Sequence, residues 1–126
     1  PSFIQMEEAI QGLVDETGTL TGAAAAGKLD KRGKVSKFQG EYASIVKGIN
    51  NTLDAVVEPV QETSQVMSRI AKKDMTARVQ GNYQGELKQL KENINLAAAK
   101  LEEAMQQVRD AVNQVSSASD QVASGS

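Results

Sequence analysis

The chain has 126 residues, a formal charge of −2 and 24% charged residues, with two Tyr, two Phe and no Trp, Cys or His. Without Cys there are no disulfides or thiolate zinc sites, and without His the commonest general base and metal ligand is missing, so we expect no enzyme, cofactor or metal. Acidic and basic residues interleave, which disfavours nucleic acid as a partner, and no apolar run approaches the roughly 20 residues of a membrane span, so this segment is not expected to be membrane-inserted.

The first predicted element is a helix over residues 1–13, "PSFIQMEEAIQGL", where Phe3, Ile10 and then Val14 recur at helical intervals. It stands directly before two repeated units, in the place where the second helix of a preceding unit would end. We therefore interpret residues 1–13 as the end of such a helix, in an array longer than this chain.

Two units of one pattern follow, over residues 14–59 and 60–105. The stretch "VDETGTLTGAAAAGKL" from Val14 matches "VQETSQVMSRIAKKDM" from Val60, at an offset of 46 residues. These matching stretches are predicted to be the first helix of each unit. Residues 106–126 then continue the last helix beyond the second unit.

The second halves of the units match at a different offset. "FQGEYASIVKGINNTLDAVVEPV" from Phe38 and "YQGELKQLKENINLAAAKLEEAM" from Tyr83 are 45 residues apart, and Gln-Gly-Glu and Ile-Asn recur at matching positions. The first copy therefore has one extra residue between Leu29 and Phe38. A loop tolerates such an insertion and a helix does not, so each unit is predicted to be a helix, a connector and a second helix.

The connector of the first unit, residues 29–40, is long for a link between helices. Helical hairpins use about two to eight loop residues, whereas this segment can extend ~40 Å at about 3.3 Å per residue. The preceding helix, residues 14–28, is only ~22 Å long at a rise of about 1.5 Å per residue. The connector can therefore return along the whole helix, which predicts that the two helices of a unit are parallel.

Each connector carries two spaced apolar residues. They are Leu29 and Val35 in the first unit and Met75 and Val79 in the second. We expect these side chains to pack into the helices and hold the returning connector. The alternative is that they are incidental apolar residues in a mobile loop.

The second helix of each unit opens with a Gly-Glu pair, Gly40-Glu41 and Gly85-Glu86. A carboxylate in the first helical turn interacts favourably with the positive end of the helix dipole, typically by about 0.3–1 kcal/mol. Glu41 and Glu86 are therefore candidates for starting these helices.

The join between the units breaks the heptad pattern. Ile45, Ile49 and Leu53 are spaced four and four before the alternation of three and four resumes, which is a stutter that locally unwinds a coiled coil. Pro59 lies in this join, where it removes a backbone donor. It either kinks a helix near Glu58 or opens the next helix at its first position.

The last helix carries the longest heptad pattern of the chain. Its apolar residues alternate in steps of three and four, which indicates a coiled-coil seam of about five heptads. A seam of roughly 50 Å needs a partner helix, so we predict a homodimer. The predicted fold is all-α: parallel four-helix coiled-coil bundles, made of helix-connector-helix units and stacked end to end in a homodimer. The seam consists of Leu87, Leu90, Ile94, Ala97, Leu101, Ala104, Val108, Ala111, Val115, Ala118 and Val122.

A helix, a connector with two spaced apolar residues, and "GE" opening a second helix with heptads throughout resemble the HAMP domain of bacterial chemoreceptors and sensor kinases. The resemblance covers residues 14–105 as two tandem copies, as in receptors with several HAMP units in a row. HAMP units usually have a proline opening the first helix and a glycine before the first connector residue. The second copy has Pro59 but Lys73 in place of that glycine, whereas the first copy has Gly27 but Leu13 in place of the proline.

The resemblance also predicts what each part does. The second connector position of the first copy falls near Gly33 or Val35. After Met105, "QQVRDAVNQVSSASDQVASGS" looks like the opening of the methyl-accepting signalling helix of chemoreceptors. The resemblance implies that the methylated glutamates and the tip that binds a histidine kinase and a coupling protein lie beyond Ser126.

These features favour a cytoplasmic signal-relay segment of a chemotaxis receptor, whose full-length form is either anchored in the inner membrane or not. Such a segment passes a conformational change from an upstream sensor to the kinase-controlling domain. One alternative is a passive coiled-coil spacer, and another is the HAMP segment of a sensor histidine kinase. A helical protein of lipid surfaces is disfavoured, because Lys72 and Lys73 are too few for a basic face.

Overall fold

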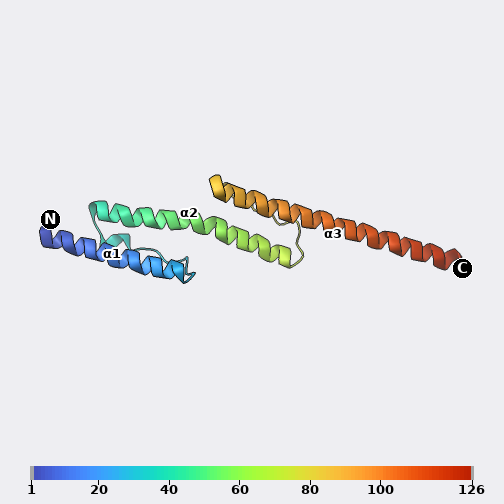
Figure 1. Cartoon of the computed structure of the whole chain (residues 1–126), viewed down its shortest axis with the longest axis horizontal. Helices are drawn as coiled ribbons and strands as arrows, with labels where there is room; N and C mark the ends of the chain where they lie inside the picture. Colours follow the sequence, from blue (N-terminus) through green and yellow to red (C-terminus); the bar gives the residue numbers. More distant parts are fainter. Residues whose placement is uncertain (1, 126) are drawn as a thin grey trace. The chain divides into compact units, whose positions relative to one another are not determined.

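The computed structural model describes residues 2–125. It contains three α-helices, α1 (Phe3–Ala25), α2 (Gly40–Ala71) and α3 (Gly85–Gly125), and one short 3₁₀ turn, η1 (Val35–Lys37), and no strand among the described residues (Figure 1). The all-α class predicted from the sequence is confirmed. Within the same residues no helix has the length and apolar character that a membrane crossing requires.

The chain divides into two compact units, the first up to Val60 and the second from Gln61. Helix α2 contributes to both, because it runs without interruption from Gly40 to Ala71. Pro59 lies inside this helix and is fully buried, so no new helix opens at the proline. The residues 1–13 and 14–25 likewise form one helix with no break between them, apart from Pro1 and Ser2.

Helix α1 is fixed at both ends by local hydrogen bonds. At its start, the Ser2 hydroxyl accepts from the Gln5 backbone N–H (3.1 Å), and the Gln5 side chain accepts from the Ser2 N–H (2.9 Å). This reciprocal pair is a capping box. At its end, Gly27 has φ of +80° and the Lys28 N–H donates to the Ala23 carbonyl (2.8 Å), which closes the last turn.

In the first unit the two helices are parallel. Helix α1 and the first half of α2 run in the same direction, and the connector between them returns along α1 before α2 begins (Figure 1). The side chains of Leu20 and Val46 are buried in this unit. The parallel arrangement predicted from the connector length is therefore present.

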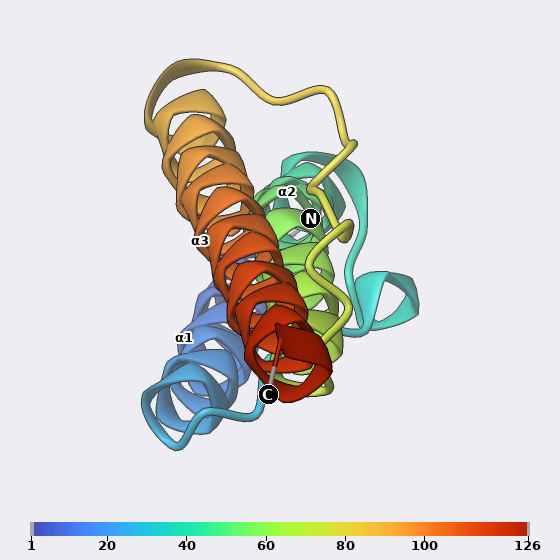
Figure 2. The ribbon, with the colours of Figure 1, turned by 90° about the vertical axis from the view of Figure 1, so that its right-hand side faces the viewer.

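The second unit repeats this arrangement with α2 and α3, as the end-on view also shows (Figure 2). Its interior is a hydrophobic cluster in which small and branched side chains pack closely. Two members, Ala77 and Val79, come from the connector. The buried members are Val66, Ile70, Ala77, Val79 and Ala98, and Met75, Tyr83 and Ile94 pack against them.

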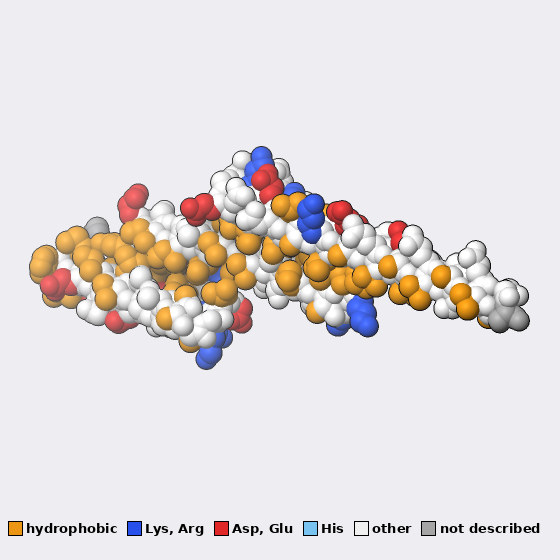
Figure 3. Space-filling model, turned by 45° about the vertical axis from the view of Figure 1, so that its right-hand side comes forward, with side chains coloured by type: hydrophobic (Ala, Val, Ile, Leu, Met, Phe, Trp, Pro, Cys, Tyr) orange, Lys and Arg blue, Asp and Glu red, His pale blue; other side chains and the backbone are white. Residues whose placement is uncertain are grey.

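Many large apolar side chains remain exposed in the single chain. Figure 3 shows them on the surface of both units as well as along α3. In α3 the exposed residues include Leu101, Val108, Val115 and Val122, which are seven residues apart and belong to the predicted seam. These positions form one stripe along the helix.

Candidate functional site

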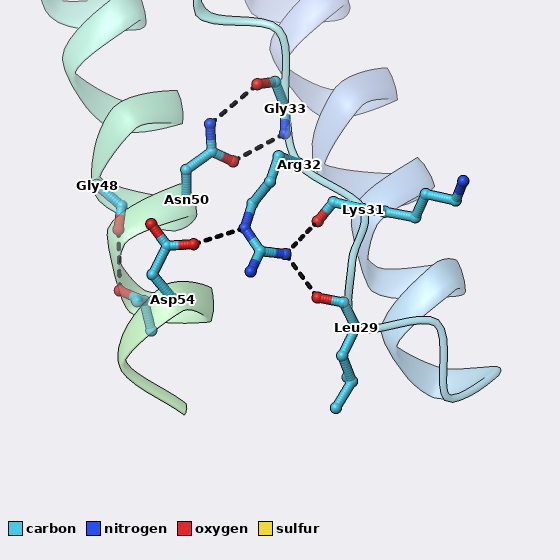
Figure 4. A network of polar contacts seen from close by, with 8 residues as sticks. Leu29, Lys31, Arg32, Gly33, Gly48, Asn50 and Asp54 are labelled. Atoms are coloured by element: carbon cyan, nitrogen blue, oxygen red, sulfur yellow. Dashed lines mark hydrogen bonds and ion pairs between the residues drawn. The ribbon is translucent and has the colours of Figure 1, made fainter. Parts of the chain in front are cut away.

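The connectors carry the most specific contacts of each unit. In the first unit, the side-chain amide of Asn50 on α2 bonds both backbone groups of one connector residue (Figure 4). Asn50 Oδ1 accepts from the Gly33 N–H (2.8 Å), and Asn50 Nδ2 donates to the Gly33 carbonyl (2.9 Å). This pair of bonds, which we call the amide clamp, fixes the connector to the second helix.

The second unit has the same clamp. Asn95 Oδ1 on α3 accepts from the Val79 N–H (2.8 Å), and Asn95 Nδ2 donates to the Val79 carbonyl (3.0 Å). Asn50 and Asn95 are 45 residues apart and belong to the recurring Ile-Asn pair of the sequence. The clamps therefore show that Gly33 occupies the place in the first unit that Val79 occupies in the second.

An arginine in each connector adds a second attachment. Arg32 Nη1 donates to the carbonyls of Leu29 (2.6 Å) and Lys31 (2.7 Å), while its Nε donates to Asp54 Oδ1 on α2 (2.8 Å) (Figure 4). The guanidinium thus shapes the connector turn and joins it to the second helix. Because Arg32 is only partly exposed and Asp54 is largely exposed, the ion pair itself adds little stability.

Arg78 repeats these contacts in the second unit. Its Nη1 donates to the carbonyls of Met75 (2.6 Å) and Ala77 (2.8 Å), and its Nη2 contacts Glu102 on α3 (3.1 Å). Arg32 and Arg78 are 46 residues apart, at the offset of the first half of the repeat. The offset therefore changes from 46 to 45 after the clamp, where η1 accommodates the extra residue of the first unit.

A glutamate on the first helix of each unit holds the connector from the other side. Glu16 Oε1 accepts from the Lys34 N–H (3.1 Å), and Lys37 Nζ lies 3.7 Å from Glu16 Oε2. In the second unit Glu62 is the corresponding residue, 46 positions later. Each connector is thus bonded to both helices of its unit.

The Glu62 carboxylate makes more bonds than Glu16. It accepts from the N–H groups of Gln80 (2.7 Å) and Gly81 (3.1 Å) and from the Tyr83 hydroxyl (2.5 Å). The hydroxyl bond, followed by the Gln80 N–H bond, holds the pKa of Glu62 below its ordinary value of 4.5, with smaller help from Gly81 and Lys91. The carboxylate therefore stays charged at neutral pH.

The predicted connector residues differ in burial. Val79 is 3% exposed, and Met75 is half-buried against the hydrophobic cluster. Leu29 is half-buried after α1, and Val35 is half-buried as the first residue of η1. The structure brings Met75 and Val79 into one cluster and gives the first unit a glycine at the clamped position.

Glu41 and Glu86 lie in the first turn of α2 and α3 and are exposed. The glycines before them, Gly40 and Gly85, each have φ of +56°, a conformation that residues with a Cβ rarely adopt. The Gly-Glu pairs therefore stand at the beginning of the second helices, where the glycine supplies the sharp entry.

Sequence reasoning missed the polar attachments. Asn50, Asn95, Glu16 and Glu62 all recur at the repeat offsets, so the repeat itself contained the signal. These side chains bind backbone groups, which carry no sequence pattern of their own. Among the described residues there is no group of three or more acidic side chains that could hold a metal ion.

Two successive units of parallel helices, each with its connector bonded to both helices, define a repeat of helical signalling modules. The chain matches the HAMP domain over residues 37–103, more than half of its length, and it belongs to this family. The resemblance inferred from the sequence is confirmed.

Among individual proteins, the chain is similar to the methyl-accepting chemotaxis protein McpB of Pseudomonas aeruginosa. The two are 31% identical over 95 residues, which are 75% of this chain and 14% of that relative. The chain thus spans a small part of the curated relative that it matches. No solved structure matches it significantly.

Proposed function

We propose that this chain is the signal-relay segment of a chemotaxis receptor. It passes a conformational change from an upstream sensor to the domain that controls a kinase. Membership of the HAMP family and the similarity to a methyl-accepting chemotaxis protein support this class of function. The observation that carries the proposal is α2, a single helix that belongs to both units.

Helix α2 carries contacts to both connectors. Asn50 clamps the first connector and Glu62 bonds the second, and these two residues are separated by about 18 Å along the helix at a rise of about 1.5 Å per residue. A rotation or shift of α2 that alters one set of bonds therefore acts on the other. Because each set consists of a few exchangeable hydrogen bonds, two packings separated by only a few kcal/mol are physically accessible.

We further propose that two chains associate in parallel, so that each unit forms a four-helix bundle. The exposed stripe of Leu101, Val108, Val115 and Val122 supports this arrangement, because heptad-spaced apolar side chains are stabilised by a facing helix. In this proposal residues 14–59 and 60–105 are two relay units. Residues 1–13 end a preceding unit, and residues 106–126 begin the signalling helix.

The remaining parts of the proposal concern the full-length receptor. A histidine kinase and a coupling protein bind through regions outside this chain, and the relay units lie in the cytoplasm. The connector residues Leu29, Val35, Met75 and Val79, the helix starts at Glu41 and Glu86, and the junction at Pro59 are the relay positions. No part of this function requires a cofactor or a catalytic group.

An insertion in α2 tests the relay against a passive spacer. One alanine inserted after Ala55 rotates the second unit by about 100° relative to the first, whereas seven inserted residues restore the phase to within about 20°. We expect the single insertion to abolish or invert the control of kinase activity by the stimulus in the full-length receptor, and the seven-residue insertion to retain it. Normal control with one inserted residue contradicts the relay, and so does loss of control with both insertions.

A further inference from the structure

The two units place apolar volume differently at one contact between the connector and the second helix. In the first unit the clamped connector residue is Gly33, and Val46 on α2 is 1% exposed. In the second unit the clamped residue is Val79, which is 3% exposed, and the helix position 45 residues after Val46 is Lys91. The apolar side chain thus comes from the helix in one unit and from the connector in the other.

The geometry of the first unit leaves no space for a side chain on its connector. A Cβ atom placed on Gly33 would lie 2.7 Å from Val46 Cγ1 and 3.4 Å from Leu20 Cδ1. The shorter separation is closer than atoms of this kind approach one another, and a buried β-branched valine has few rotamers with which to move away. Gly33 and Val46 therefore fit only as a pair.

The second unit solves the same contact in the opposite way. Lys91 is half-buried, and its ammonium donates to the Gly81 carbonyl of the connector (2.8 Å). A flexible lysine stem ending on that carbonyl accompanies a buried Val79 in the hydrophobic cluster. Val79 and Lys91 therefore form the alternative pair.

The polar contacts do not distinguish the two connectors. Both amide clamps bond the N–H and carbonyl of one residue, and both arginines bond backbone carbonyls and a carboxylate. Such contacts accept either connector on either second helix. Repeat proteins of this kind are prone to pair equivalent segments of different repeats during folding, so discrimination has to come from side-chain volume.

We propose that the pairs Gly33–Val46 and Val79–Lys91 are specificity determinants that let each connector pack only on the second helix of its own unit. A connector with valine on a helix with valine clashes, and a connector with glycine on a helix with lysine leaves an unfilled space. Both wrong combinations are disfavoured without any change in the clamps. This inference concerns the pairing of segments and does not rest on the proposed relay.

A double-mutant cycle on the 126-residue chain tests the pair in the first unit. We expect Gly33→Val alone to lower the folding equilibrium constant roughly 10- to 100-fold, the size of a typical overpacking effect. Adding Val46→Lys, which installs the pair of the second unit, should restore it to within about threefold of the starting chain. Urea unfolding at one protein concentration measures each variant.

Milder substitutions keep the cycle informative if Gly33→Val prevents folding. Gly33→Ala also introduces a Cβ beside Val46, and it should be tolerated better when Val46→Ala is present. The proposal is overturned if the second substitution brings no recovery in either cycle, because the two positions then act independently.

A refolding experiment tests discrimination itself. The variant Gly33→Val/Val46→Lys gives both units the same pair, and we expect it to form a mispaired, larger fraction on refolding, which size-exclusion chromatography separates. The matched control adds Val79→Gly/Lys91→Val, so that the pairs are exchanged but again different, and it should refold as uniformly as the unaltered chain. Uniform refolding of the same-pair variant overturns the proposal, as does equal misassembly of the control.

Discussion

Lys73 occupies a backbone conformation that favours glycine. Its φ is +74°, close to the +80° of Gly27 at the corresponding position 46 residues earlier. Both residues close the last turn of a helix, since the Lys28 N–H donates to Ala23 and the Asp74 N–H donates to the Arg69 carbonyl (2.9 Å). A left-handed conformation costs a residue with a Cβ about 1–2 kcal/mol.

The substitution Lys73→Gly should therefore stabilise the chain. Relief of the left-handed conformation is partly offset by the greater freedom of glycine in the unfolded chain, so we expect a gain of about 0.5–1 kcal/mol. Urea unfolding at fixed protein concentration measures it. The matched control is Lys72→Gly, one residue earlier and without positive φ, which should destabilise; a loss of stability in Lys73→Gly contradicts the argument.

At the scale of elements, Glu62 joins the second connector to α2 through a network that depends on its charge. The bonds from Tyr83 and Gln80 lower the pKa of Glu62 in the folded chain. Such a group contributes stability above its unfolded pKa, near 4.5. The contribution disappears as the pH falls through the lower pKa of the folded state.

The substitution Glu62→Gln should accordingly destabilise the chain at pH 7 and cost progressively less below about pH 4.5, where the carboxylate of the unaltered chain takes up a proton. Unfolding free energies at pH 7 and near pH 3.5 measure the difference. Glu58→Gln, at an exposed carboxylate on the same helix, is the control and should show little effect at either pH. A pH-independent cost for Glu62→Gln would show that its charge does not hold the connector.

The elements were predictable where apolar spacing determines them. Heptad periodicity predicted the helices, and the length of the connector predicted that they are parallel. Pro59 and the stutter suggested a break in α2, yet the helix continues because the missing hydrogen bond is a local cost and the proline is buried. Tertiary packing of this kind leaves no mark in the periodicity.

Connector geometry was predictable only in part. The extra residue of the first unit lay somewhere between Leu29 and Phe38, and only the positions of the clamps and η1 place it after Gly33. The apolar side chain at this contact was sought on the connector, whereas in the first unit it stands on α2 as Val46. A volume that moves between two elements cannot be assigned from one element's sequence.

At the scale of the whole molecule, the exposed heptad stripe of α3 decides whether the chain acts alone. Val115 is 66% exposed in the single chain, and Leu101, Val108 and Val122 share its heptad position. A lone helix gains nothing from such a stripe. In a parallel dimer each of these side chains faces its own copy, where burial of apolar area stabilises the complex by about 25 cal/mol per Å².

The substitution Val115→Glu separates the two cases. In a parallel dimer it removes two buried valines and places two carboxylates opposite each other, so we expect a loss of roughly 2–3 kcal/mol, or a roughly 30- to 100-fold weaker dimer by sedimentation equilibrium. Gln114→Glu adds the same charge one position away, off the stripe, and should leave the dimer nearly unchanged. Equal effects of the two substitutions would attribute the loss to charge alone, and a monomeric unaltered chain at high concentration would contradict the dimer itself.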